Sequence, residues 1–112
     1  MAVLALADIH GIAGRRTELL AAAQQLERAA QGQDGCVRYS FAAGVADPDH
    51  HVMISEWRDR AALDAHYESP VFAAFQFALD GLLSRHSELT IYEVNSATRP
   101  VASGPMDPRD AD

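Results

Sequence analysis

The sequence predicts a single α+β domain built from four strands and two helical regions in the order β-α-β-β-α-β. Three observations support this prediction. The chain has 112 residues, the usual length of one domain with one hydrophobic core. Four short runs are rich in apolar residues, as expected for strands, and they cover residues 2–9, 36–43, 51–57 and 88–94. Two other regions repeat apolar residues at helical spacing, residues 15–31 and 59–84.

Glycines separate the first strand from the first helix. Residues 2–9 are apolar at almost every position, which is typical of a strand covered on both faces. Gly11 and Gly14 then interrupt the chain. Residues 15–31 place apolar side chains on one helix face, and Gly32 supplies a helix stop. That face consists of Leu19, Ala22, Ala23, Leu26 and Ala30.

Residues 36–43 and 51–57 are the second and third strands, joined by the loop 44–50. A connection this short predicts that the two strands are antiparallel neighbours. We expect His50 and His51, at the end of this loop, to be solvated. Adjacent side chains on an extended chain point apart, so the pair is a poor chelate, and no metal site is predicted.

Capping residues predict two further helices. Asp59 begins a short helix that runs to about Tyr67, because its carboxylate can accept hydrogen bonds from first-turn amides. Ser69-Pro70 begins the next helix, since serine is a good cap and proline at the first helical position has no amide to leave unpaired. An apolar stripe predicts that this helix continues to about Ser84. The stripe consists of Phe72, Phe75, Leu79, Leu82 and Leu83.

The last predicted strand, residues 88–94, closes a domain of residues 1–94. The following stretch, residues 95–112, holds three of the five prolines together with Ser, Gly and Asp. This composition is typical of a chain that buries little apolar surface of its own. We therefore expect a flexible or draped C-terminal tail.

The predicted order of elements is that of the ferredoxin-like fold, whose helices cover only one face of a four-stranded antiparallel sheet. The strands nevertheless carry apolar residues on both faces. In the third strand, Val52 and Ile54 share one face, whereas Met53 and Trp57 lie on the other. An apolar sheet face without helices implies a partner. We therefore expect a homodimer.

Composition excludes several classes of partner. The net charge of −7 disfavours nucleic acid and anionic membranes. The apolar run at residues 2–7 is too short to cross a bilayer and lacks a basic flank, so no signal peptide is predicted and the expected location is the cytoplasm. The single cysteine, Cys36, agrees with a reducing compartment, and we expect it to be a buried structural thiol.

Several segments together carry a family resemblance: residues 34–39, 54–59, 62–66, 69–72 and 91–94. Their Glu-x-Trp and His-x-x-Ser-Pro-x-Phe patterns resemble those of the antibiotic biosynthesis monooxygenase family, and the resemblance extends over residues 2–94. It implies a dimeric α/β barrel in which two sheets pack face to face. It also implies a cavity in each subunit, between the sheet and the helices.

The family resemblance implies several possible reactions, because members include cofactor-free oxygenases, quinol oxygenases, haem degraders and an isomerase. Haem degraders carry Asn, Trp and His at the positions that hold Ala7, His66 and Gln76 here. Gln76 is not a normal haem ligand. The resemblance therefore leaves the quinol-oxygenase branch or members with no established reaction. The quinol-oxygenase branch implies dioxygen and a small aromatic phenol or quinol as substrates and no cofactor.

His66 is the candidate catalytic base, because imidazole takes up protons near neutral pH. Trp57, Phe72 and Phe75 would shape a slot for a flat ring, and Tyr39 would donate a hydrogen bond to a substrate oxygen. The alternatives are that Trp57 is a core residue, as tryptophans at strand ends most often are, and that Tyr39 serves an interface. We expect His66 to lie on the helix surface, so that its removal leaves the fold intact. The alternative is that His66 only caps its helix and bonds to nearby backbone.

Two other functions remain open. The chain could be a dimeric module that binds a small molecule without turnover, or a cofactor-free isomerase in which His66 moves protons on a small hydroxyketone. An enzyme should direct His66 into a cavity with polar groups beside it, whereas a binding module could leave it buried or solvated.

Overall fold

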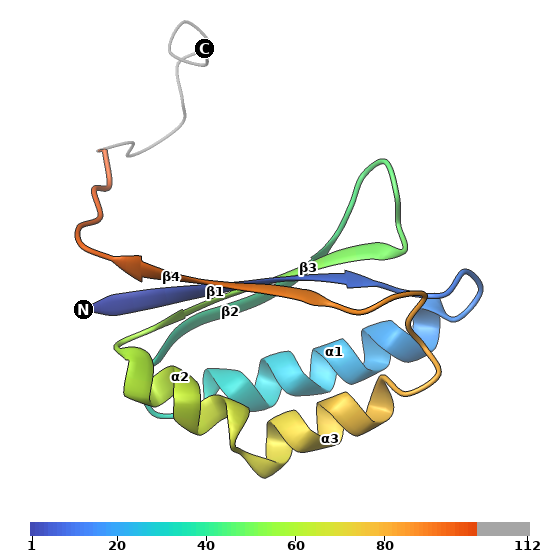
Figure 1. The fold of residues 1–112 in the computed structure, drawn as a ribbon, viewed down its shortest axis with the longest axis horizontal. Coiled ribbons are helices and arrows are strands. Elements are labelled where there is room, and N and C mark those ends of the chain that lie inside the picture. The colour runs from blue at the N-terminus through green and yellow to red at the C-terminus, as the bar shows by residue number, and fades with distance from the viewer. Residues whose placement is uncertain (101–112) are drawn as a thin grey trace, which may run out of the picture.

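The structure, a computed structural model, describes residues 1–100, and the predicted tail beyond them lies outside the described residues. Residues 95–100 form neither helix nor strand. The elements are β1 (Ala2–His10), α1 (Arg16–Gln31), β2 (Cys36–Ala43), β3 (His50–Trp57), α2 (Arg60–Tyr67), α3 (Pro70–Ala78) and β4 (Glu88–Val94). This order confirms the predicted ferredoxin-like α+β fold, with two helices in its second helical region (Figure 1).

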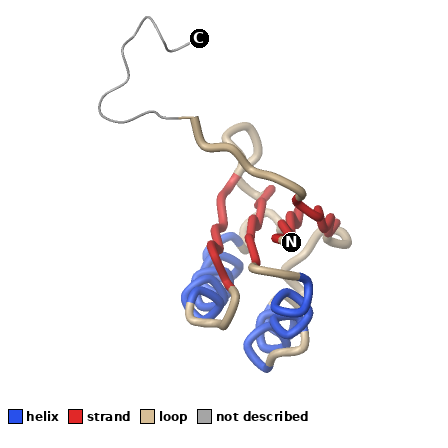
Figure 2. The backbone as a smooth tube through the Cα atoms, turned by 90° about the vertical axis from the view of Figure 1, so that its left-hand side faces the viewer, coloured by secondary structure: helices blue, strands red, loops and turns tan. Residues whose placement is uncertain are grey.

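The four strands form one antiparallel sheet in the order β2-β3-β1-β4. All three helices lie on one face of this sheet (Figures 1 and 2). Every second residue of β1 is buried beneath them, because successive side chains of a strand point to opposite faces. These residues are Val3, Ala5, Ala7 and Ile9.

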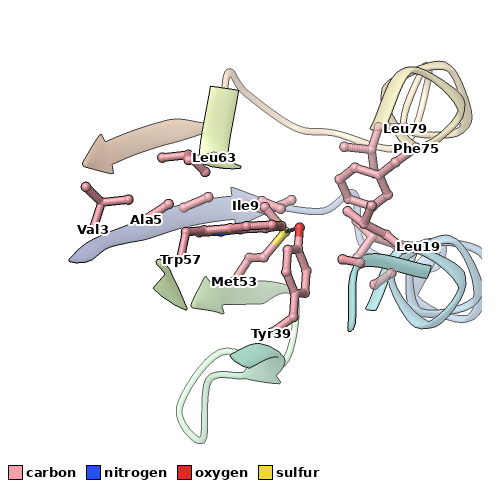
Figure 3. Packing of buried hydrophobic residues seen from close by; sticks show 14 of the residues in the cluster. Val3, Ala5, Ile9, Leu19, Tyr39, Met53, Trp57, Leu63, Phe75 and Leu79 are labelled. Atoms are coloured by element: carbon pink, nitrogen blue, oxygen red, sulfur yellow. Dashed lines mark hydrogen bonds between the residues drawn. The ribbon is translucent and has the colours of Figure 1, made fainter. Parts of the chain in front are cut away.

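The hydrophobic core fills the space between the sheet and the helices (Figure 3). Leu19 and Leu26 reach it from α1, which packs against β2 and α3. Trp57 and Met53 reach it from β3, and Phe75 from α3. Burial of such side chains stabilises the fold by roughly 1.5–3 kcal/mol each. No helix among residues 1–100 is long and apolar enough to span a membrane.

Both predicted helix caps are present. The Asp59 carboxylate accepts a hydrogen bond from the Ala62 amide at 2.9 Å, at the start of α2. The Ser69 hydroxyl accepts one from the Phe72 amide at 3.2 Å, at the start of α3. The same hydroxyl donates to the carbonyl of His66 at 2.6 Å and so links the two helices.

The prediction that the last helix continues to Ser84 is wrong, because α3 ends at Ala78. Gly81 has a φ of +79°, a left-handed conformation that a helix cannot continue through. Leu79 and Leu82 are nevertheless buried in the core. Their apolar spacing is compatible with a turn as well as with a helix, and this explains the error.

The prediction that His50 and His51 are solvated in a loop is also wrong. Both belong to β3, because β1 extends to His10 and pairs it with His50. His51 is fully buried on the helix side, and neither of its ring nitrogens has a hydrogen-bond partner within residues 1–100. His50 points to the other face, where its Nε2 lies 2.7 Å from the Asp8 carboxylate. The two rings therefore point apart, as predicted.

The sheet face opposite the helices is apolar over its centre. The register places Leu6 beside Ile54 and Leu4 beside Tyr92 on this face. Ile54 is 38% exposed and Tyr92 50% exposed. None of the three helices lies over this face (Figure 1), so within residues 1–100 the structure has the uncovered apolar face that the strand sequences predict. We call this surface, made by Leu4, Leu6, Val52, Ile54 and Tyr92, the open face.

Candidate functional site

His66 lies in the last turn of α2 and is almost fully buried, with 2% of its surface exposed. Its ring stacks on the Trp57 indole, with centroids 4.8 Å apart and planes inclined by 29°. Tyr39 and Phe72 present their edges to it at 5.4 and 5.2 Å. Three of the predicted substrate-binding residues thus converge on the predicted base. We call His66, Trp57, Tyr39 and Phe72 the aromatic cluster.

Phe75, the fourth predicted substrate-binding residue, lies one step further away. Its ring centroid is 6.2 Å from that of Phe72, within the same helix. Phe75 also lines a separate hollow of about 220 Å³ between α1 and α3. Phe75 therefore packs against Phe72, and its ring forms no pair with that of His66.

The backbone explains why these four rings meet. Trp57 is the last residue of β3 and Asp59 caps α2, so one tight corner places His66 above the strand end. The β2–β3 register sets Tyr39 opposite Ser55, on the helix side of the sheet. The Ser69 hydroxyl bonds to the His66 carbonyl and brings the first turn of α3, with Phe72, to the ring.

Polar contacts reach both nitrogens of the His66 ring. Its Nε2 lies 3.4 Å from the hydroxyl oxygen of Tyr39, which also donates a hydrogen bond to the Met53 sulfur at 2.9 Å (Figure 3 shows Tyr39 beside Met53). Its Nδ1 lies 2.5 Å from Oε1 of Gln33. Sequence reasoning missed Gln33, because a glutamine just after a helix stop carries no signal of a contact 33 residues along the chain.

Burial lowers the pKa of His66 to about 4 and raises the pKa of Tyr39 far above its usual range. Both shifts arise because an apolar environment disfavours the charged form of each group. His66 is therefore neutral at physiological pH, the form a base requires. The expectation that His66 is a helix-surface residue is wrong, because the ring faces inward onto Trp57.

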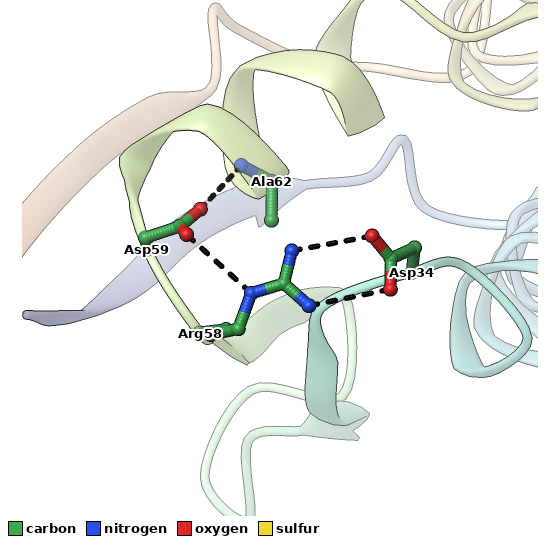
Figure 4. Close-up of polar contacts among 4 residues, drawn as sticks. All are labelled: Asp34, Arg58, Asp59 and Ala62. Atoms are coloured by element: carbon green, nitrogen blue, oxygen red, sulfur yellow. Dashed lines mark hydrogen bonds and ion pairs between the residues drawn. The ribbon is translucent and has the colours of Figure 1, made fainter.

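A hollow of about 390 Å³ opens between α2 and the turn that follows α1, and His66 forms part of its lining. Gln33 and Ala62 also line it. At its rim, the Arg58 guanidinium donates two hydrogen bonds to the Asp34 carboxylate, each 3.2 Å long, as Figure 4 shows. This ion pair is exposed and therefore contributes little to stability. The hollow brings solvent-accessible space to the edge of the His66 ring.

The helix-side face of β4 is less covered than that of β1. Leu89 and Ile91 pair with Ala7 and Ala5, so they face the helix side of the sheet. Leu89 is nevertheless 49% exposed, whereas its neighbour Ala7 is buried. The helices therefore cover β1 more completely than β4.

Trp57 contributes a free hydrogen-bond donor. The indole Nε1 is buried and has no hydrogen-bond partner within residues 1–100. A buried donor without an acceptor lowers the free energy of unfolding by about 1–3 kcal/mol. Such a group calls for an explanation, and a hydrogen bond to a ligand is one. The cluster thus combines a neutral imidazole, an unpaired donor and apolar walls. Within residues 1–100 no group of three or more His, Cys, Asp or Glu side chains could hold a metal ion.

A family model described as antibiotic biosynthesis monooxygenase matches residues 2–77. The chain belongs to the antibiotic biosynthesis monooxygenase family. The Synechocystis protein named "Uncharacterized protein sll1783" is 30% identical over 80 residues, 71% of this chain and 54% of that protein. The Bacillus subtilis protein named "Putative monooxygenase YcnE" is 31% identical over 61 residues, 54% of this chain and 64% of that protein. The chain thus spans only about half to two thirds of these relatives.

Solved structures share the fold. The structure of Rv0793 from Mycobacterium tuberculosis superposes with a TM-score of 0.82 at 22% identity, covering 88% of this chain and all of that one. A conserved protein from Methanosarcina mazei gives a TM-score of 0.79 at 24% identity, covering 82% of this chain and 91% of that one. At these identities the likeness concerns the fold, and any activity must be argued from the site.

Proposed function

We propose that this chain is a cofactor-independent monooxygenase that oxidises a small aromatic phenol or quinol with dioxygen, in keeping with its family. One observation carries the proposal: a buried neutral imidazole, His66, stacks on Trp57, whose indole N–H has no hydrogen-bond partner among residues 1–100. A base beside an unpaired donor is what formation of a substrate oxyanion requires. The surrounding rings leave only 2% of His66 exposed, and the hollow lined by His66 and Gln33 is where a substrate would enter.

In this reaction His66 accepts the hydroxyl proton of the substrate, and Trp57 donates a hydrogen bond to the resulting oxyanion. The electron-rich anion then reacts with dioxygen through one of its ring carbons. Loss of water from the peroxide leaves one oxygen atom in the product, so a quinol and dioxygen yield a hydroxyquinone and water. The substrate supplies all four electrons, and no external reductant is needed.

The energetics show why the indole donor matters. A phenol with a pKa of about 10 gives its proton to an imidazole of pKa about 4 at a cost of about 8 kcal/mol. Turnover near once per second allows a total barrier of about 17 kcal/mol. Proton transfer would then use about half of this barrier. A hydrogen bond from Trp57 in a dry site lowers that cost by stabilising the oxyanion.

An oxygen-electrode screen of quinols and anthrones tests the proposal. We expect oxygen uptake without added flavin, haem or metal, undiminished by a chelator. With ¹⁸O₂, the product should contain one labelled oxygen atom. Trp57 is the only tryptophan of the chain, so quenching of its fluorescence reports binding next to His66. Quenching by a quinol without oxygen uptake would overturn the proposal in favour of the binding module.

We propose in addition that the protein is a homodimer joined through the open face. Apolar side chains of three neighbouring strands form this surface, with Leu6 and Ile54 at its centre. A second copy has the same apolar surface, so a two-fold symmetric dimer would pack the open face of one subunit against the open face of the other. A stable interface needs about 1,000 Å² or more, which one whole sheet face can supply.

A further inference from the structure

We propose that Gln33 holds the ring proton of His66 on Nδ1 and thereby leaves the lone pair of Nε2 directed into the aromatic cluster. Gln33 Oε1 lies 2.5 Å from His66 Nδ1, and Nε2 faces the Tyr39 hydroxyl at 3.4 Å. Within the aromatic cluster, this side-chain contact of Gln33 is to His66 alone. Gln33 is therefore a positioning residue that acts through the imidazole.

The backbone of Gln33 is anchored on both sides, so its side chain reaches the imidazole from a defined origin. Its amide donates to the Ala30 carbonyl at 3.0 Å, and its carbonyl accepts from the Cys36 amide at 3.1 Å. Two residues later, the Gly35 carbonyl accepts from the Arg58 amide at 2.8 Å. The turn after α1 is thus tied to the corner that begins α2, the helix that carries His66.

The chemistry of the two groups assigns the proton. A neutral imidazole has one N–H donor and one acceptor nitrogen, and the partner of one nitrogen decides the state of the other. Oε1 of an amide only accepts hydrogen bonds. Nδ1 must then be the donor, and Nε2 keeps its lone pair. The Tyr39 hydroxyl donates to the Met53 sulfur at 2.9 Å, so the lone pair of Nε2 stays available.

This assignment explains how a buried imidazole can serve as a base on its inner side. With the proton on Nε2 instead, the nitrogen that faces Tyr39 would be a donor and could take no proton from a substrate. Where it concerns turnover, the inference rests on the function proposed above. The position of the proton in the resting protein does not depend on that function.

NMR of the folded protein with ¹⁵N-labelled histidine tests the inference, because the ¹⁵N chemical shift separates a protonated ring nitrogen from a bare one. His66 is assigned among the five histidines by the signal that is lost in His66→Gln. We expect a protonated Nδ1 and a bare Nε2. A proton on Nε2 in the parent protein would overturn the inference.

Three variants sharpen this test. Gln33→Leu removes the acceptor at similar size, and the Nδ1 proton should be lost or shared with Nε2. Gln33→Glu keeps an oxygen acceptor, so it should keep the proton on Nδ1 and raise the pKa of His66 through its negative charge. Gln24→Leu, a matched change at an exposed position of α1, should leave the His66 signals unchanged. A His66 spectrum that Gln33→Leu does not alter would contradict the inference.

Kinetics separate this inference from the proposed function. On a substrate that the parent oxidises, Gln33→Leu should lower kcat by about 10- to 100-fold with little change in KM, the range found for partners that orient metal-bound histidines. Gln33→Glu should recover part of that loss. If the parent oxidises the substrate and Gln33→Leu matches it, the inference fails while the function stands. If no substrate is oxidised, the function fails, and the NMR result still decides the position of the proton.

Discussion

The Trp57 indole and the His66 imidazole stack on each other at 4.8 Å between β3 and α2. Both residues are buried, at 0% and 2% exposure, and both belong to the packed interior as much as to the candidate site. A substitution at either position therefore changes stability and chemistry together. Variants must be chosen so that these two effects can be separated.

Replacement of His66 should reveal both roles. His66→Ala leaves a cavity under Trp57 and should lower the free energy of unfolding by about 2–4 kcal/mol. His66→Gln fills more of the space and should remain folded, but it lacks the base and should lower turnover by about 10²- to 10⁴-fold. Urea unfolding and oxygen uptake measure the two effects. If folded His66→Gln keeps more than about half of the parent activity, His66 is not the base.

Trp57→Phe tests the unpaired indole donor. It removes a buried N–H that has no hydrogen-bond partner in the described part of the chain, which offsets part of the packing loss. The free energy of unfolding should therefore fall by no more than about 2 kcal/mol. Trp57→Ala, the control for packing, should cost about 3–5 kcal/mol. On a proven substrate, Trp57→Phe should lower kcat about 10²-fold, because the oxyanion loses its donor. An unchanged kcat would show that the indole N–H does not act on the substrate.

Stability should fall with acidity through the buried histidines. The pKa of His66 drops from 6.5 in the unfolded chain to about 4 in the fold, so the unfolded state binds more protons between these values. The contribution of neutral His66 to the free energy of unfolding is complete above pH 6.5. It is lost as the pH falls to about 4, a change of about 3 kcal/mol. Burial lowers the pKa of His51 as well, which adds to the loss.

Urea unfolding of the parent protein and of His66→Gln at pH 7 and pH 4.5 isolates the share that belongs to His66. The variant lacks the ionisable ring, while its carboxylates and His51 titrate as in the parent. Its free energy of unfolding should therefore decrease less between the two pH values. An equal decrease in both proteins would mean that His66 is not held neutral by the fold.

Gly35 should tolerate no side chain. Its φ is +82°, and an added Cβ would lie 2.5 Å from the Cβ of Ala62 in α2. Gly14 has a similar φ of +87° with open space around it, so Gly14→Ala measures the backbone strain alone, about 1 kcal/mol. Gly35→Ala should cost at least about 1–3 kcal/mol more, because the turn must move away from α2. Equal costs in thermal unfolding would show that this contact is loose.

The homodimer can be tested at the open face. Ile54→Arg places a charge on this surface, where the side chain is already 38% exposed, so the monomer should fold while the dimer dissociates. Val45→Arg, at a fully exposed position of the β2–β3 loop, is the control and should leave the dimer intact. Light scattering at micromolar concentration gives the mass. A monomeric parent protein would contradict the proposed assembly.

Local signals in the sequence were sufficient for most of the fold. The caps Asp59 and Ser69 start their helices as predicted, because a cap depends only on amides within the next turn. The four strands follow from runs of apolar residues bounded by glycine, proline and polar residues. The end of α3 could not be predicted in this way, because the apolar spacing through Leu82 fits a turn as well as a helix.

The sequence by itself determined the fold class, the family pattern and the candidates His66, Trp57, Tyr39 and Phe72. Only the tertiary structure decided that His66 is buried and neutral, because desolvation depends on rings contributed by β2, β3 and α3 together. The contact with Gln33 likewise requires that the turn after α1 is bound to the start of α2. Such contacts join residues far apart in the chain, and no local periodicity encodes them.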